Sequence, residues 1–202
     1  YLRKHEYDKA LQDLDKAIDL NSKSYSAYHN RGMAYSGKGR HEKAVEEFSK
    51  VLEINPNSTL LLKDRATAYR KLGEYELALA DLRKCLELDK KFAPGYAALG
   101  LLYAVAPQPP ISNPTQALKM AKRAVELTNG TSPDMWENLA EVQNALQDKA
   151  GAIESLKKAL AMDPRNNEYL SLLAKWQGSM RAAGPRPVSR EAKRVNPFPT
   201  LW

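Results

Sequence analysis

The side chains that could act in catalysis or bind a metal are few and widely separated in the sequence. The 202 residues include three histidines, His5, His29 and His41, and one cysteine, Cys85. A structural zinc site needs about four cysteine or histidine ligands at short spacings, and a cysteine nucleophile needs a paired base. The spacing of these four residues in the sequence matches neither pattern. We therefore predict that the chain is not an enzyme and has no catalytic residue, metal site or cofactor.

A glycine-rich segment at residues 37–39 is the nearest approach to a phosphate-binding loop. It contains a lysine between two glycines but lacks the spacing and the Ser or Thr of a nucleotide-binding loop. Two glycines so close together break a helix instead. The segment is typical of a turn that joins two helices.

The positive charge of the chain is concentrated at one end. The net charge is +7, from 31 basic and 24 acidic residues, but six basic residues and one acidic residue lie between Lys175 and the end. Residues 1–174 are therefore nearly neutral, and nucleic-acid binding would depend on the tail rather than on a charged face. No apolar run reaches the roughly 18 residues that a membrane span needs.

Identical or similar residues recur at intervals of 34 positions in several columns of the sequence. Within each interval the apolar residues are three or four apart, first over residues 28–35 and then over residues 44–51, which indicates two helices. The chain is therefore predicted to be all-α and built from repeated helix pairs. Cys85 shares one of the recurring positions, so it is expected to be a small core residue. These positions include Tyr1, Tyr35, Tyr69 and Tyr103; Ala10, Ala44 and Ala78; Leu14, Phe48 and Leu82; Ala17, Val51 and Cys85; and Gly32, Ala66 and Gly100.

These positions resemble the tetratricopeptide repeat. The segment with the best match carries Tyr28, Gly32, Tyr35, Ala44, Phe48 and Pro56, with Arg31 where the family usually has leucine. The resemblance implies a solenoid in which antiparallel helix pairs form a right-handed superhelix. It divides the chain into an array at residues 1–182, of about five repeats with a truncated first repeat and a final capping helix, and a basic, proline-rich tail at residues 183–202.

The resemblance also implies a binding surface, because the first helices of successive repeats line a concave groove that holds a peptide in such proteins. Along the array this groove is expected to be basic, then apolar, then acidic, unless the pattern is only solvated surface charge. The residues expected to line it are His29, Asn30, Met33, Lys63, Thr67, Arg70, Ala97, Leu101, Glu137, Asn138, Glu141 and Asn144.

The expected function is a non-catalytic scaffold or adaptor that binds a peptide segment or helix of a partner protein. Asn30 matches the asparagine of a clamp that grips chaperone C-termini in some relatives, but Leu60 and Asp64 stand where that clamp needs Lys and Arg. We therefore do not predict a chaperone cofactor. Two alternatives are a regulatory or targeting domain of a larger enzyme and nucleic-acid binding through the tail, which we rank last.

Two further segments carry expectations. Tyr7, Leu11 and Leu14 are among the residues expected to form an exposed apolar stripe on the first helix, so residues 1–20 are a candidate for self-association, as is the C-terminal tail. A proline-rich insertion at residues 106–111 interrupts the 34-residue period. It is either a tolerated insertion or a lip that closes one edge of the groove.

Overall fold

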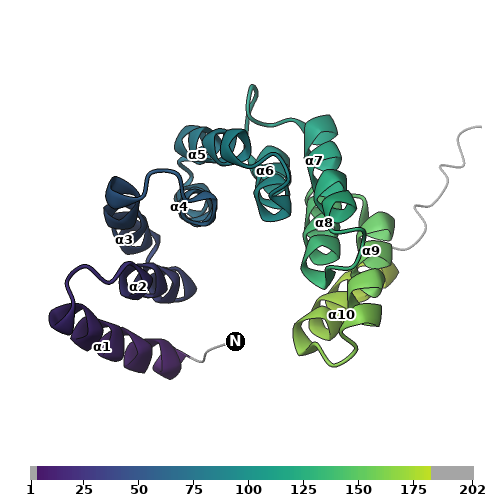
Figure 1. Ribbon diagram of the computed structural model, residues 1–202. Coiled ribbons are helices and arrows are strands. Elements are labelled where there is room, and N and C mark those ends of the chain that lie inside the picture. Colours follow the sequence, from purple (N-terminus) through teal and green to yellow (C-terminus); the bar gives the residue numbers. More distant parts are fainter. Residues whose placement is uncertain (1–3, 183–202) are drawn as a thin grey trace, which may run out of the picture.

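The computed structural model describes residues 4–182, and these residues form ten α-helices without a strand (Figure 1). The tail at residues 183–202, with the self-association and nucleic-acid expectations placed on it, lies outside the described residues. The helices are α1 (Lys4–Leu20), α2 (Tyr25–Gly37), α3 (His41–Ile54), α4 (Thr59–Leu72), α5 (Tyr75–Leu88), α6 (Ala93–Val105), α7 (Pro114–Leu127), α8 (Pro133–Ala145), α9 (Lys149–Met162) and α10 (Asn167–Ala182).

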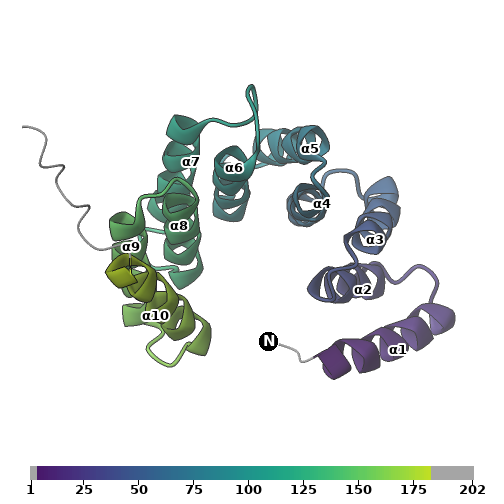
Figure 2. The ribbon, with the colours of Figure 1, turned by 180° about the vertical axis from the view of Figure 1, so that it is seen from behind.

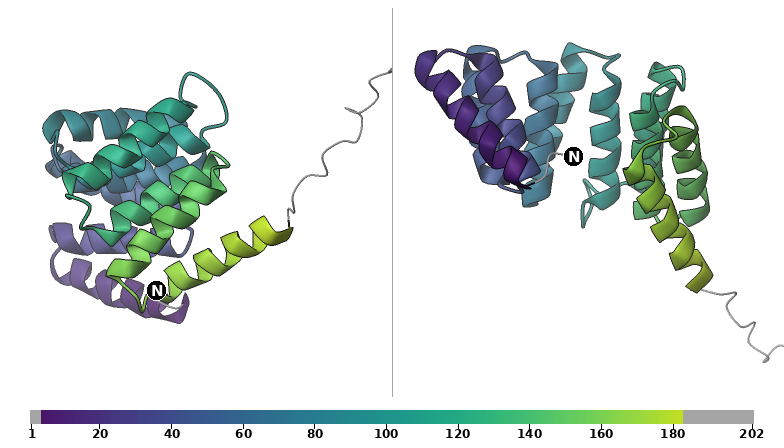
Figure 3. Two further views of the ribbon diagram at one scale, coloured as in Figure 1. Left: turned by 90° about the vertical axis from the view of Figure 1, so that its right-hand side faces the viewer. Right: turned by 90° about the horizontal axis from the view of Figure 1, so that it is seen from below.

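The helices pack in consecutive pairs that form an arch. Figure 1 shows α4, α6 and α8 on the inside of the arch and α5, α7 and α9 on the outside, and Figure 2 shows the same order from behind. The views at right angles in Figure 3 show the pairs stacked side by side. The predicted all-α solenoid of helix pairs is therefore confirmed. None of the described helices is both long enough and apolar enough to cross a membrane.

Local sequence fixes where individual helices begin and end. Asn113 caps α7, because its Oδ1 accepts a hydrogen bond of 3.1 Å from the backbone N–H of Gln116, and Pro114 occupies the first turn, where no N–H is needed. Gly73 ends α4 with φ at 82°, a left-handed conformation that favours glycine. The proline-rich insertion is therefore followed directly by α7, which Asn113 caps.

The core repeats along the array with the period of the sequence. One alanine of each second helix is completely buried, and the residues four and seven positions later are buried as well. Such columns let the two helices of a pair approach closely and pack as one unit. The alanines of α3, α5, α7 and α9 are Ala44, Ala78, Ala117 and Ala152.

Glycine allows a close approach between the backbones of α6 and α7. A Cβ placed on Gly100 would lie 2.9 Å from the carbonyl oxygen of Ala117 and 3.0 Å from the backbone nitrogen of Ala121. Because both neighbours are backbone atoms, they cannot move aside without shifting α7. Gly32 has a similar role in α2, where an added Cβ would lie 2.5 Å from the ring of Phe48.

Arginine replaces the usual leucine in α2, and its guanidinium joins three helices. Arg31 donates to Glu47 of α3 at 2.8 and 3.1 Å and to Asp15 of α1 at 2.7 Å. Arg65, 34 residues later, donates to Asp81 of α5 at 2.8 Å through two nitrogens and to Ser49 of α3 at 3.0 Å. Each guanidinium is part-buried, so its acceptors are needed to offset the loss of hydration.

The apolar stripe expected on the first helix is only partly exposed. Leu11 is buried, so the expectation was wrong for this residue. Tyr7, Ala10 and Leu14 are half-buried. They line a depression of about 550 Å³ between α1 and α2, to which Met33 also contributes.

Replacing Gly100 with leucine should destabilise the array. The new side chain must displace the backbone of α7, so we expect Gly100→Leu to lower the free energy of unfolding by about 1–3 kcal/mol. Gly178→Leu is the matched control, because Gly178 also lies in a helix but has open space around its Cα. Equal melting temperatures for the two variants, measured by circular dichroism, would contradict this packing.

Candidate functional site

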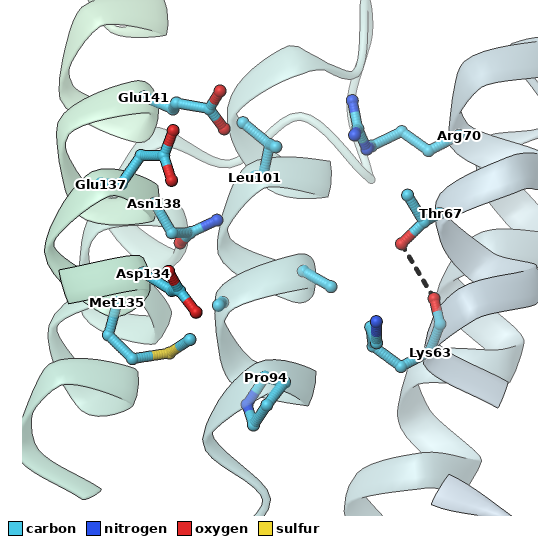
Figure 4. Close-up of a pocket in the computed structure, with 12 residues that line it drawn as sticks. Lys63, Thr67, Arg70, Pro94, Leu101, Asp134, Met135, Glu137, Asn138 and Glu141 are labelled. Carbon is cyan, nitrogen blue, oxygen red and sulfur yellow. Dashed lines mark hydrogen bonds between the residues drawn. The ribbon is translucent and has the colours of Figure 1, made fainter. Parts of the chain in front are cut away.

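A groove opens on the inside of the arch, where three first helices lie side by side. Its volume is about 290 Å³, and α4, α6 and α8 provide one wall, the floor and the other wall (Figure 4). The floor is apolar, with Pro94, Ala97 and Leu101 from α6. The residues that line the groove are Lys63, Thr67, Arg70, Pro94, Ala97, Ala98, Leu101, Asp134, Met135, Glu137, Asn138 and Glu141.

The α4 wall is basic, but its two cations differ in their surroundings. Lys63 is paired with Asp64, a buried carboxylate that is also joined to His29 Nε2 by a hydrogen bond of 2.8 Å. Much of the Lys63 charge is therefore balanced within the protein. Arg70, further along the same helix, has no ion pair among the described residues and points across the groove (Figure 4). Burial lowers the pKa of Arg70, although Glu141 opposes this effect.

The α8 wall is acidic, with Asp134, Glu137 and Glu141 on one helical face (Figure 4). Their spacing of three and four residues places them in a row along the groove. Tyr169 of α10 donates a hydrogen bond of 3.3 Å to Asp134 Oδ1 from behind this row. The wall is therefore supported by the last helix that the structure describes.

Burial makes protonation of the carboxylates on this wall easier, and their mutual repulsion adds to the effect at Glu137. Burial raises the pKa of Glu137 to about 7, and the negative charges of Glu141, Glu168 and Asp134 add to the effect. Burial also raises the pKa of Glu141, while Arg70 and Lys71 oppose this rise. A positive group that entered the groove would stabilise both ionised carboxylates.

Asn138 lies between these carboxylates on α8. Its Oδ1 atom is buried and accepts no hydrogen bond from the described residues. An unsatisfied buried acceptor costs about 1–3 kcal/mol. The amide is therefore suited to accept a hydrogen bond from a donor that enters the groove.

The structure divides the residues expected in the groove into two sets. Eight of the twelve line it, from Lys63 on α4 to Glu141 on α8. The other four do not. His29 is bonded to Asp64, Asn30 and Met33 face the depression between α1 and α2, and Asn144 lies in the last turn of α8, beyond the groove. The groove therefore extends from α4 to α8, and the residues expected on α2 lie outside it.

Several features were missed in the sequence. Met135 and Ala98 line the groove without having been expected there. Asp64 was considered only as a mismatch to a chaperone clamp, yet it fixes both His29 and Lys63. None of the residues of the 106–111 insertion lines the groove, which favours a tolerated insertion over a lip.

The single cysteine of the chain lies in the core and not in the groove. Cys85 is buried, and its thiol donates to the carbonyl oxygen of Thr59 at 3.3 Å. Burial raises the pKa of this thiol to about 11, which keeps it protonated and unreactive at neutral pH. The prediction that Cys85 is a small core residue is confirmed. Within residues 4–182, no three His, Cys, Asp or Glu side chains are arranged as metal ligands.

The repeat pattern matches a known family over most of the array. Sequence profiles of the tetratricopeptide repeat match residues 25–58, 60–92 and 111–167. The chain belongs to the tetratricopeptide repeat family. Members of this family are generally non-catalytic scaffolds, and the repeats and their structural neighbours support a protein-interaction scaffold for this chain. The unmatched residues 93–110 contain α6 and all but the last residue of the proline-rich insertion.

Solved structures share the fold at low sequence identity. A thermophilic TPR protein from Thermus thermophilus has a TM-score of 0.75 and 21% identity, over 86% of this chain and 91% of that chain. The Cut9–Hcn1 structure from the APC/C has a TM-score of 0.70 and 16% identity, over 88% and 34%. YrrB, described as a TPR protein with an unusual peptide-binding site, has a TM-score of 0.51 and 24% identity, over 83% and 84%. A comparison with curated protein sequences gave no match.

The raised pKa of Glu137 predicts how stability depends on pH. Because folding raises this pKa from 4.5 to about 7, the folded state binds the proton more tightly than the unfolded state. The free energy of unfolding should therefore fall as the pH rises from about 4.5 to 7. Glu137→Gln should remove this fall and be more stable than the wild type by about 1–3 kcal/mol at pH 8.

Urea unfolding at pH 5 and pH 8 measures the effect. Glu46→Gln, at an exposed position of α3, is the control for loss of one carboxylate. The assignment is wrong if the Glu137 and Glu46 variants show the same change in stability between the two pH values.

Proposed function

We propose that the concave groove binds an extended peptide segment of a partner protein in one orientation. An acidic residue of the peptide would lie near Arg70 and a basic residue near Glu137 and Glu141. A small apolar side chain between them would rest on Ala97 and Leu101. The observation that supports this proposal is an apolar floor between two walls of opposite charge that form no ion pair with each other among the described residues.

The buried amide of α8 supports an extended backbone in particular. Asn138 Oδ1 has no hydrogen-bond donor among the described residues, and a peptide in extended conformation presents backbone N–H groups at regular intervals. One such N–H would satisfy the amide oxygen. The peptide would then gain a contact that does not depend on its sequence, while the charged walls select its direction.

Charge reversal tests the orientation. We expect Arg70→Glu to weaken binding of the peptide Glu-Ala-Leu-Ala-Lys by about tenfold, because the acidic end loses its partner and meets a like charge. Arg83→Glu is the matched control, since Arg83 is an exposed cation of α5 that does not line the groove. Isothermal titration calorimetry at low and moderate salt provides the affinities.

A double reversal makes the test specific. The variant Arg70→Glu/Glu141→Arg exchanges the charges of the two walls and should prefer the reversed peptide Lys-Ala-Leu-Ala-Glu. The proposal fails if neither peptide binds the unaltered protein, or if the variants and the Arg83 control have the same affinities for both peptides.

The alternatives from the sequence remain proposals of lower rank. A regulatory or targeting array in a larger enzyme would use the same groove, so its test is the domain content of the parent protein. Nucleic-acid binding would use residues 183–202, which lie outside the described residues. It predicts a steep dependence of affinity on salt that the groove variants do not change.

Self-association through residues 1–20 is a second proposal, and one observation favours it. Ala10 and Leu14 occupy the same columns as Ala44 and Phe48, which are completely covered by the preceding helix. On α1 these columns are half-buried and line the depression of about 550 Å³. A helix of a second copy could cover them as α2 covers α3.

Sedimentation velocity at rising protein concentration tests this second proposal. We expect reversible dimers, and we expect Leu14→Asp to remove them because a carboxylate would have to be buried. Asp13→Asn is the control, since Asp13 lines the same depression but is exposed. A protein that remains monomeric at every concentration would exclude association through α1.

A further inference from the structure

The outer face of the array contains the same groove twice, in different repeats. One groove lies between α3 and α5 over α4, and the other lies between α7 and α9 over α8. Six lining positions correspond when they are counted from the completely buried alanine of each second helix or from the small residue of each first helix. Pro56 lines only the first groove, and Gln143, Gly151, Glu154 and Ser155 line only the second. The corresponding pairs are Ser49 and Lys122, Leu52 and Val125, Glu53 and Glu126, Leu62 and Trp136, Arg65 and Leu139, and Lys84 and Lys158.

In the first groove the protein supplies its own occupant. Arg65 extends along the groove and is held by two hydrogen bonds to the buried Asp81 and one to Ser49. The remaining cavity is about 220 Å³. Arg31 of α2 makes the corresponding hydrogen bonds one repeat earlier, with Glu47 and Asp15 as its acceptors.

In the second groove the whole ionic arrangement is replaced. Leu139 stands in place of the arginine, Ser155 in place of the buried carboxylate, and Lys122 in place of the serine. The cavity is larger, at about 350 Å³. Because the guanidinium and its carboxylate are lost together, a cation in this groove would find no buried partner. The space is therefore suited to a neutral, apolar group.

The floor of this second groove is an aromatic ring held in a fixed position. The indole Nε1 of Trp136 donates to the carbonyl oxygen of Gly130 at 2.9 Å, and Lys158 Nζ lies 4.6 Å from the ring centroid. Gly130 has φ of 68°, so the turn that presents this carbonyl favours glycine. A preformed apolar slot of this kind binds a side chain with little loss of conformational entropy.

The helices around the slot carry an excess of positive charge. Each of α7 and α9 has three basic residues and one acidic residue, and most of these are exposed. Both acidic residues already form ion pairs within their own helices. The basic residues are Lys119, Lys122, Arg123, Lys149, Lys157 and Lys158, and the acidic residues are Glu126 and Glu154.

We propose that the groove between α7 and α9 is a second docking site, which binds an acidic segment of a partner protein through one large apolar side chain placed on Trp136. The site lies on the opposite face of the array from the concave groove and goes beyond its proposed function. A protein segment fits better than a nucleic acid, because the slot takes one apolar side chain and Lys158 covers one face of the ring on which a base would have to stack.

The first groove indicates how to fill the second groove while leaving Trp136 unchanged. The variant Leu139→Arg/Ser155→Asp/Lys122→Ser reproduces the arrangement of Arg65, Asp81 and Ser49. The new arginine should fill the slot as it does one groove earlier, with the fold retained. Circular dichroism and the melting temperature monitor the fold.

The probe is a fluorescein-labelled peptide, Asp-Glu-Phe-Leu-Glu-Asp, with Asp-Glu-Ser-Ser-Glu-Asp as its control for charge alone. In fluorescence anisotropy with the full chain, we expect the filled variant to bind the first peptide at least about tenfold more weakly than the unaltered protein. Arg70→Glu, in the concave groove, should leave this affinity unchanged. Failure of this site and failure of the concave site are thereby distinguished.

A second measurement does not depend on the variant. In the unaltered protein, the apolar peptide should shift the NMR signal of the Trp136 indole N–H, and the serine peptide should not. The proposal is overturned if the first peptide does not bind at millimolar concentration, if the two peptides bind equally, or if the indole signal does not move. It is also overturned if a single-stranded oligonucleotide shifts that signal at lower concentration than the peptide.

Discussion

The close contact between the two helices of each pair determines the geometry of the rest of the array. A completely buried alanine on each second helix, from Ala44 to Ala152, brings the backbones together, and at Gly100 the contact is with backbone atoms of the neighbour. Because each repeat packs only on its neighbours, the same contact made several times produces a curved stack. The curvature places α4 and α8 on either side of α6, so that Arg70 and Glu141 face each other without forming an ion pair.

Charged residues have two different roles in this stack. Arg31, Arg65 and the Asp64 cluster are bonded within the protein, and they connect helices that lie next to each other. Arg70 and Glu141 border an open groove and are available to a ligand. A charge pattern along a helix face does not separate these roles. The separation depends on which helix lies opposite, which is a property of the packed array.

Much of the fold could be predicted from the sequence because its constraints are periodic. The 34-residue columns place glycine and alanine at the helix contacts, and Asn113 with Pro114 marks a helix start. The groove residues were harder to predict where the side chains of the first helices are bonded to other residues of the protein. His29 lies outside the groove because its hydrogen bond to Asp64 crosses from α2 to α4, and the angle between repeats cannot be deduced from spacing within one repeat. Asn144 follows the periodic pattern but lies at the end of its helix, beyond the floor that α6 provides.

The two arginines that link neighbouring helices, Arg31 and Arg65, have a mechanical consequence. Arg31 ties α2 to both α1 and α3, and Arg65 ties α4 to both α3 and α5, through hydrogen bonds that weaken sharply when their geometry changes. At the corresponding place on α8, Leu139 makes only non-directional apolar contact. A stretching force on the two ends of the array would therefore meet unequal stiffness along the solenoid. We expect the segment from α1 to α5 to act as a stiff spring and the segment from α7 to α9 as a softer one, so that bending of the array concentrates in its second half.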